Sequence, residues 1–139
     1  MNEDANVELV RSGYEKFGSG DIPGLLSLLT PDIDWSTPHI ENAPFGGRLL
    51  GLPEVGNFFS KLGEAEDFAY FEPSEFIAKG DRVVVLGRAK ATVKSTGRDY
   101  EIDWVHIFTV HEGKITNFAE FFDTAVVDKA FQKAATTAS

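Results

Sequence analysis

Hydrophobic and polar positions follow two different periods along this chain. In the first half, apolar residues recur at spacings of three and four, which is typical of amphipathic helices. In the second half they alternate with polar residues, which is typical of strands that bury one face. Helices followed by antiparallel strands predict an α+β fold in which the helices lie over the concave face of a strongly curved sheet.

Three helices are predicted in the first half of the chain. The first covers Glu3 to Phe17. The second follows Asp21, which suits the N-cap position, and we expect Pro31 to end it. The third begins near Gly51, and Gly63 is a natural residue for its C-terminal cap.

The remaining segments are predicted as strands, loops and one last helix. A short strand is expected over 32–37, a loop over 38–50 and a solvated acidic link over 64–67. Longer strands are expected over 68–78, 82–94, 100–110 and 115–122. Pro73 lies within the first of these, which indicates an edge strand or a bulge. A last helix is expected from Thr124 to about Phe131, with a frayed end over 134–139. Residues 1–139 show no repeat or domain boundary, so we expect a single domain.

The last two strands hold the best candidate site. His111-Glu112-Gly113 suits a three-residue hairpin loop, with Gly113 at a positive φ angle. That loop makes His106 and Glu120 diagonal neighbours on one face of the hairpin. A two-residue loop would change the parity and place them on opposite faces. We prefer the three-residue loop because both strands then present one continuous aromatic face.

An imidazole and a carboxylate in an aromatic pocket suit acid–base chemistry, so His106 and Glu120 are the candidate catalytic residues. The alternative is a hydrogen-bonded pair that satisfies itself in the core. Residues expected to line a ligand pocket are Trp35, Trp104, Phe108, Phe118, Phe122, Tyr14 and His39. Each of these also has a plainer interpretation, as core packing for the aromatic residues and as exposed surface for His39.

Composition narrows the function further. The chain has 139 residues, 42% of them hydrophobic and 25% charged, which is typical of a globular domain. A net charge of −9 repels phosphate backbones, so we expect no nucleic-acid partner. The absence of cysteine fits a reducing cytoplasm, and no apolar run is long enough for a membrane span. No phosphate loop or metal-ligand motif is present, so no cofactor or metal is expected.

The order of elements and four local motifs resemble the nuclear-transport-factor-2-like superfamily, which includes ketosteroid isomerase, limonene epoxide hydrolase and SnoaL-like polyketide cyclases. The motifs are the segments 14–21, 28–35, 51–59 and 113–125. The resemblance implies a cone-shaped fold that encloses an apolar pocket. SnoaL-like cyclases carry a His on the penultimate strand and an acid on the last, matched here by His106 and Glu120, although the acid is usually Asp. The general-base position of the isomerases holds Thr37, so their chemistry is not implied.

The resemblance also implies a homodimer that packs through the outer sheet face, which here offers Val105, Ile107, Ala119 and Phe121. The sequence therefore predicts a SnoaL-like protein of unassigned reaction. It favours cofactor-free acid–base catalysis, of isomerase, cyclase or hydrolase type, on a hydrophobic small molecule. A ligand-binding module without catalysis and a dimerisation module of the same fold are the alternatives.

Overall fold

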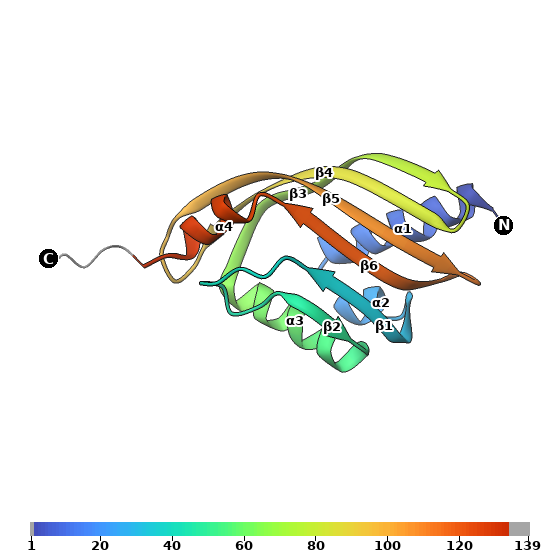
Figure 1. Ribbon diagram of the computed structural model, residues 1–139, viewed down its shortest axis with the longest axis horizontal. Coiled ribbons are helices and arrows are strands. Elements are labelled where there is room, and N and C mark those ends of the chain that lie inside the picture. Colours follow the sequence, from blue (N-terminus) through green and yellow to red (C-terminus); the bar gives the residue numbers. More distant parts are fainter. Residues whose placement is uncertain (1, 134–139) are drawn as a thin grey trace, which may run out of the picture.

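A computed structural model describes residues 2–133. Within that range the helices are α1 (Glu3–Gly18), α2 (Ile22–Leu26), α3 (Leu52–Ala65) and α4 (Thr124–Phe131). The strands are β1 (Leu29–Thr37), β2 (Gly47–Leu50), β3 (Glu66–Lys79), β4 (Arg82–Val93), β5 (Asp99–His111) and β6 (Lys114–Phe122). The strands form one curved, open sheet in the order β2-β1-β6-β5-β4-β3 (Figure 1). The frayed end expected over 134–139 lies outside the described residues.

The α+β fold with N-terminal helices is confirmed, but the sheet is mixed rather than antiparallel. Strand β1 runs parallel to β6, with Trp35 beside Phe118, while the other neighbouring strands are antiparallel. Alternation of apolar residues reports which face of a strand is buried, and it carries no information about the direction of the neighbouring strand. The parallel pairing brings the aromatic residues of β1 next to those of β6.

Several boundaries in the first half of the chain differ from the sequence predictions. The helix after Asp21 ends at Leu26, and Pro31 lies within β1 instead of ending a helix. The strand tolerates Pro31 because its register against β6 shifts between Leu29 and Asp34. The segment Gly47–Leu50 was expected to be loop, but it pairs with β1 as an edge strand.

The predicted acidic link over 64–67 is wrong. Helix α3 continues through Gly63 to Ala65, and β3 begins directly at Glu66. Glu66 is 4% exposed, so it is a buried carboxyl group and not part of a solvated link. The prediction for Pro73 is confirmed, because β3 is the edge strand and its register shifts between Pro73 and Glu75.

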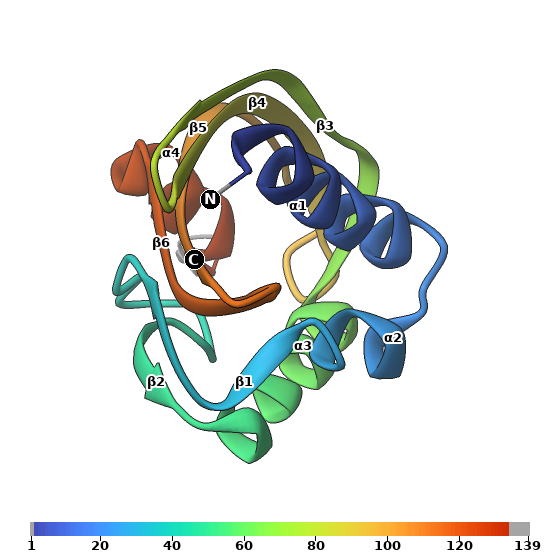
Figure 2. The same cartoon turned by 90° about the vertical axis from the view of Figure 1, so that its right-hand side faces the viewer.

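The concave face of the sheet holds the core. The strands bend from β3 round to β2, with α1 and α3 on the inner side (Figure 2). Helix α1 packs against β3 and β4, α3 packs against β1, and α4 packs against β5. Within residues 2–133, no helix combines the length and the apolar character needed to cross a membrane.

Candidate functional site

The β5–β6 hairpin turns through two residues, so the predicted three-residue loop is wrong. His111 pairs with Lys114, and the turn residues Glu112 and Gly113 have φ angles of 49° and 77°. Positive φ at both central residues is typical of the type I′ turn, whose twist matches that of the flanking strands. By the parity argument, this turn alone would place His106 and Glu120 on opposite faces.

A bulge in β6 restores the shared face. The register shifts between Thr109, which pairs with Asn117, and Val110, which pairs with Ile115. Thr116 is therefore one extra residue in β6, and its hydroxyl group donates to the carbonyl oxygen of Thr109 at 3.3 Å. The turn and the bulge each change the parity once, so the two changes cancel.

As a result, His106 lies directly opposite Glu120, closer than the diagonal arrangement expected. The Nε2 atom of His106 is 2.8 Å from the Oε2 atom of Glu120. His106 is buried, and the Glu120 side chain is 14% exposed. The other carboxylate oxygen of Glu120, Oε1, makes no hydrogen bond within residues 2–133 and is left for the cavity described below.

Tyr14 on α1 completes a chain of three side chains. Its hydroxyl oxygen is 2.6 Å from Nδ1 of His106. With Glu120 ionised, Nε2–H donates to the carboxylate, and Nδ1 accepts from the Tyr14 hydroxyl group. Burial raises the pKa of Tyr14 well above its usual range, and the negative charge of Glu120 raises it further. Tyr14 therefore remains a hydrogen-bond donor throughout the physiological pH range.

Aromatic packing holds the imidazole in place. The Trp104 indole stacks on the His106 ring with centroids 4.0 Å apart and planes 18° apart. Trp104 in turn lies across Gly87 on β4, where an added Cβ atom would overlap the indole ring. Glycine at this position lets the indole approach the backbone closely and keeps it flat against His106.

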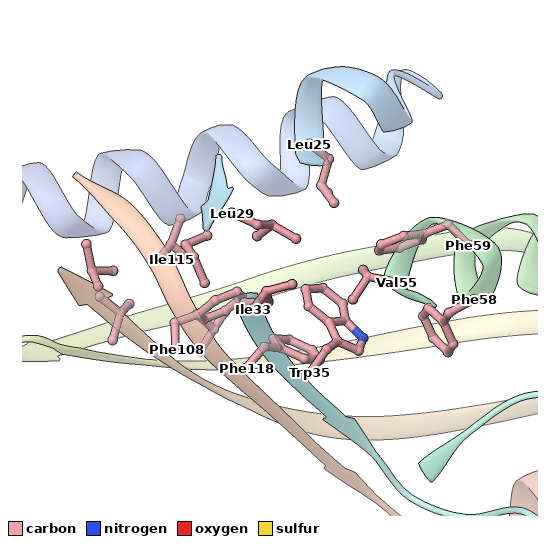
Figure 3. Close-up of a cluster of buried hydrophobic side chains, with 14 of the residues drawn as sticks. Leu25, Leu29, Ile33, Trp35, Val55, Phe58, Phe59, Phe108, Ile115 and Phe118 are labelled. Carbon is pink, nitrogen blue, oxygen red and sulfur yellow. The ribbon is translucent and has the colours of Figure 1, made fainter. Parts of the chain in front are cut away.

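A cavity in the concave face reaches this polar chain. Its volume is about 100 Å³. Seven of the nine residues proposed from the sequence line it: Tyr14, Trp35, His106, Phe108, Phe118, Glu120 and Phe122. Trp35 stacks on Phe118 with centroids 3.9 Å apart and forms one wall together with Phe58 and Phe59 (Figure 3).

Two proposed pocket residues do not line the cavity. His39 is exposed, so we remove it from the candidate site. Trp104 is 1% exposed and packs behind His106, so it positions the imidazole instead of contacting the cavity.

Sequence reasoning missed three polar residues that line the same cavity: Glu66, Thr37 and Tyr100. The hydroxyl group of Tyr100 donates to Oε1 of Glu66. Thr37 is 7% exposed, and its hydroxyl group has no partner within residues 2–133. Glu66 lies two residues before the inward-facing Phe68, so the two side chains share a face of β3. Had the predicted strand begun two residues earlier, its alternation would have placed Glu66 on the inward face.

The chemistry available in the cavity is acid–base chemistry. In the part of the chain that the structure describes, no Lys or Arg side chain lines it, and its ionisable groups are carboxyl, imidazole and phenol. Within residues 2–133, no cluster of three or more His, Cys, Asp or Glu side chains is placed to hold a metal ion. The arrangement can therefore orient a carboxylate and move a proton within an apolar enclosure.

Comparisons with known proteins agree with the fold. Residues 10–118 match the family model of the SnoaL-like domain. An NTF2-like protein from Burkholderia xenovorans LB400 is 36% identical, with a TM-score of 0.87 over 95% of this chain and 99% of that one. TerC, crystallised with polyporic acid, is 32% identical, with a TM-score of 0.83 over 91% of this chain and 98% of its own. The uncharacterized protein Rv0034 of Mycobacterium tuberculosis H37Rv is 22% identical over 131 residues, which are 94% of this chain and 98% of that protein.

Proposed function

Since the chain belongs to the SnoaL-like domain family, we propose that it binds a hydrophobic small molecule in its cavity and catalyses a proton transfer on it. Glu120 is the general base or acid, and His106 and Tyr14 position it. The substrate class is a hydrophobic carbonyl or epoxide-like compound, and the reaction is of isomerase, cyclase or hydrolase type, carried out by side-chain acid–base chemistry.

The hydrogen-bonded chain from Tyr14 through His106 to Glu120 carries this proposal. One carboxylate oxygen of Glu120 is held by Nε2 of His106 at 2.8 Å, which leaves the other oxygen for a substrate proton. A carboxylate at the edge of an apolar cavity has few water molecules around it, so it loses little solvation when it takes a proton from a bound substrate. A positioned acid or base of this kind contributes on the order of 10²- to 10⁴-fold to a rate.

Two observations support a small-molecule ligand. Trp35 Nε1 and Thr37 Oγ1 line the cavity without a hydrogen-bond partner within residues 2–133, and buried polar groups normally have one. TerC, which is 32% identical to this chain, was crystallised together with polyporic acid. A ligand with oxygen or nitrogen acceptors on an apolar frame would satisfy these groups.

Proton transfer is tested by isotope exchange, which needs no knowledge of the product. A panel of hydrophobic ketones is incubated with the protein in D₂O, and loss of the α-proton signals is followed by NMR. We expect exchange with the wild type and at least a 100-fold slower rate with Glu120→Gln. His39→Ala is the control, because His39 is exposed and lies outside the cavity.

The same panel separates the alternative functions. Ketones that bind without exchange in the wild type would favour a ligand-binding module. Equal exchange by the wild type and Glu120→Gln would end the proposed mechanism.

We also propose that the protein forms a homodimer through the outer face of the sheet. Phe121 and Ile77 are large apolar residues on that face, 55% and 47% exposed, and contiguous apolar surface of this kind is typical of an interaction site. Val105 and Ile107, between them on β5, point the same way. A second copy of the chain would cover these side chains.

A further inference from the structure

A second polar pair lies in the same cavity, away from Glu120. Glu66 begins β3 and is 4% exposed, and Tyr100, near the start of β5, is 7% exposed. Tyr100 and His106 lie on the same face of β5, roughly 20 Å apart along the strand. Both pairs line one cavity, so the enclosure has polar groups toward two ends and aromatic walls between them.

Among the described residues, no cation neutralises Glu66. Its hydrogen-bond partner within residues 2–133 is the Tyr100 hydroxyl group, and the charge that bears on it across the cavity is the negative charge of Glu120. The next residue in β3, Asp67, pairs with Lys94 at 3.7 Å. On the adjacent α4, Asp128 is bound to Asn42. An ionised Glu66 is therefore poorly stabilised.

The neutral acid is the form that this environment favours near neutral pH. Burial raises the pKa of Glu66 to about 7; the Tyr100 hydrogen bond opposes this rise, and the charge of Glu120 adds to it. Tyr100 donates to Oε1, so the acid proton belongs on Oε2. Oε2 makes no hydrogen bond within residues 2–133, so its O–H group is available as a donor to the cavity.

We propose that Glu66 and Tyr100 form a second binding site, which holds a neutral carbonyl oxygen at the far end of an elongated aromatic ligand. This inference rests on the proposed function, because the other end of the ligand lies against Glu120. The site selects against anions, since the described residues that line the cavity include two carboxyl groups and no Lys or Arg. It thereby narrows the substrate class to uncharged aromatic compounds that carry a carbonyl group at the end remote from Glu120.

Matched probes test the donor role of Glu66. The probes are 4-acetylbiphenyl, its hydrocarbon analogue 4-isopropylbiphenyl and the anion biphenyl-4-carboxylate, titrated by calorimetry at pH 6.0 and 8.5. We expect the wild type to bind the ketone about fivefold more tightly than the hydrocarbon at pH 6.0, as for one added hydrogen bond. The preference for the ketone should disappear at pH 8.5, and the anion should bind most weakly of the three probes at both pH values.

Three variants identify the group responsible. Glu66→Gln still donates a hydrogen bond but does not titrate, so its ketone preference should be equal at the two pH values. Glu66→Ala should show no preference at either. Asp67→Asn removes a carboxylate from the exposed neighbouring position and should behave like the wild type.

The outcomes separate this inference from the proposed function. A preference that survives in Glu66→Ala, or that does not change with pH in the wild type, would overturn the inference. If Glu120→Gln abolishes the preference while Glu66→Ala keeps it, the ketone binds at Glu120, and only the proposed function stands. If none of the three probes binds the wild type, both proposals fail.

Discussion

The two ring nitrogens of His106 have different partners, and this division defines how Glu120 is held. Tyr14 bonds Nδ1 at 2.6 Å and Glu120 bonds Nε2 at 2.8 Å, so the imidazole is fixed from both sides. A fixed tautomer keeps the Nε2 proton on the bond to the carboxylate. The Glu120 carboxylate therefore has a defined orientation, which it needs in order to exchange a proton with one particular atom of a bound substrate.

Replacing Tyr14 with Phe tests whether the Tyr14 hydrogen bond to Nδ1 fixes the tautomer of His106. The change leaves Nδ1 of His106 buried without a partner, which should lower stability by about 1–3 kcal/mol. The ¹⁵N chemical shifts of the His106 ring should show a mixture of tautomers where the wild type shows one. If the ring shifts of Tyr14→Phe match those of the wild type, Tyr14 does not set the tautomer.

Glu66 gives the protein a predictable pH dependence of stability. Its pKa is 4.5 when unfolded and about 7 when folded, so between these values the folded state holds a proton that the unfolded state has lost. The contribution of Glu66 to stability is therefore complete below pH 4.5 and is lost as the pH rises to about 7, by up to about 3 kcal/mol.

Denaturant titrations of wild type and Glu66→Gln across pH 4.5–8 measure this effect. The difference in unfolding free energy should move in favour of Glu66→Gln as the pH rises, and Asp67→Asn should not show this trend. A constant difference over that range would mean that folding does not change the pKa of Glu66.

The sequence predicted one of these residue pairs and missed the other. His106 and Glu120 were found because each lies in a clearly alternating strand. Glu66 was missed because it follows Glu64 and precedes Asp67, and a run of acids is usually solvated. Its burial depends on Tyr100, which lies 34 residues away and is out of reach of local patterns.

The β5–β6 hairpin shows how an element can be predicted with the right face and the wrong turn. The continuous aromatic face correctly required His106 and Glu120 to lie together. The expected three-residue loop achieved this in one step, whereas the protein uses a two-residue turn and a bulge at Thr116. Burial decides which face of a strand points into the core. A bulge adds one residue to a strand, so it can restore that face after a two-residue turn, at any point along the strand.

The turn itself offers a stabilising substitution. Glu112 has a φ angle of 49°, which is unfavourable for most side chains and well tolerated by Asn. Glu112→Asn should raise stability by about 0.5–1 kcal/mol, and Gly113→Ala, also at positive φ, should lower it by a similar amount. Thermal unfolding of both variants measures the effect. A loss of stability in Glu112→Asn would show that the Glu112 side chain contributes more than its backbone strain costs.

At the scale of the whole molecule, the class of fold was predictable, but the partners and relative directions of the strands were not. Helical and alternating periods indicated helices on a curved sheet. The parallel β1–β6 pair and the short β2 escaped prediction, because periodicity identifies buried faces without identifying partners. These two features matter for the site, since β1 brings Trp35 and Thr37 to the cavity.

The proposed dimer accounts for the one face of the sheet that the helices leave uncovered. Phe121 on β6 pairs with Val105 on β5, which pairs with Leu86 on β4, so an apolar row crosses the outer face. A charge in this row would have to be desolvated on association, so Phe121→Asp should convert a dimer into a monomer. Light scattering after gel filtration should give twice the 15.3 kDa chain mass for the wild type and the single mass for Phe121→Asp.

Val126→Asp is the matched control for this experiment. Val126 is an exposed apolar residue on α4, 38% exposed, and its replacement changes the net charge by the same amount as Phe121→Asp does. Val126→Asp should remain a dimer, which separates loss of the interface from general charge repulsion. A wild type that is already monomeric at micromolar concentration, or a Phe121→Asp that still dimerises, would show that the outer face is not the subunit contact. In that case the exposed row would need a different partner, because the described residues 2–133 leave Phe121 55% exposed.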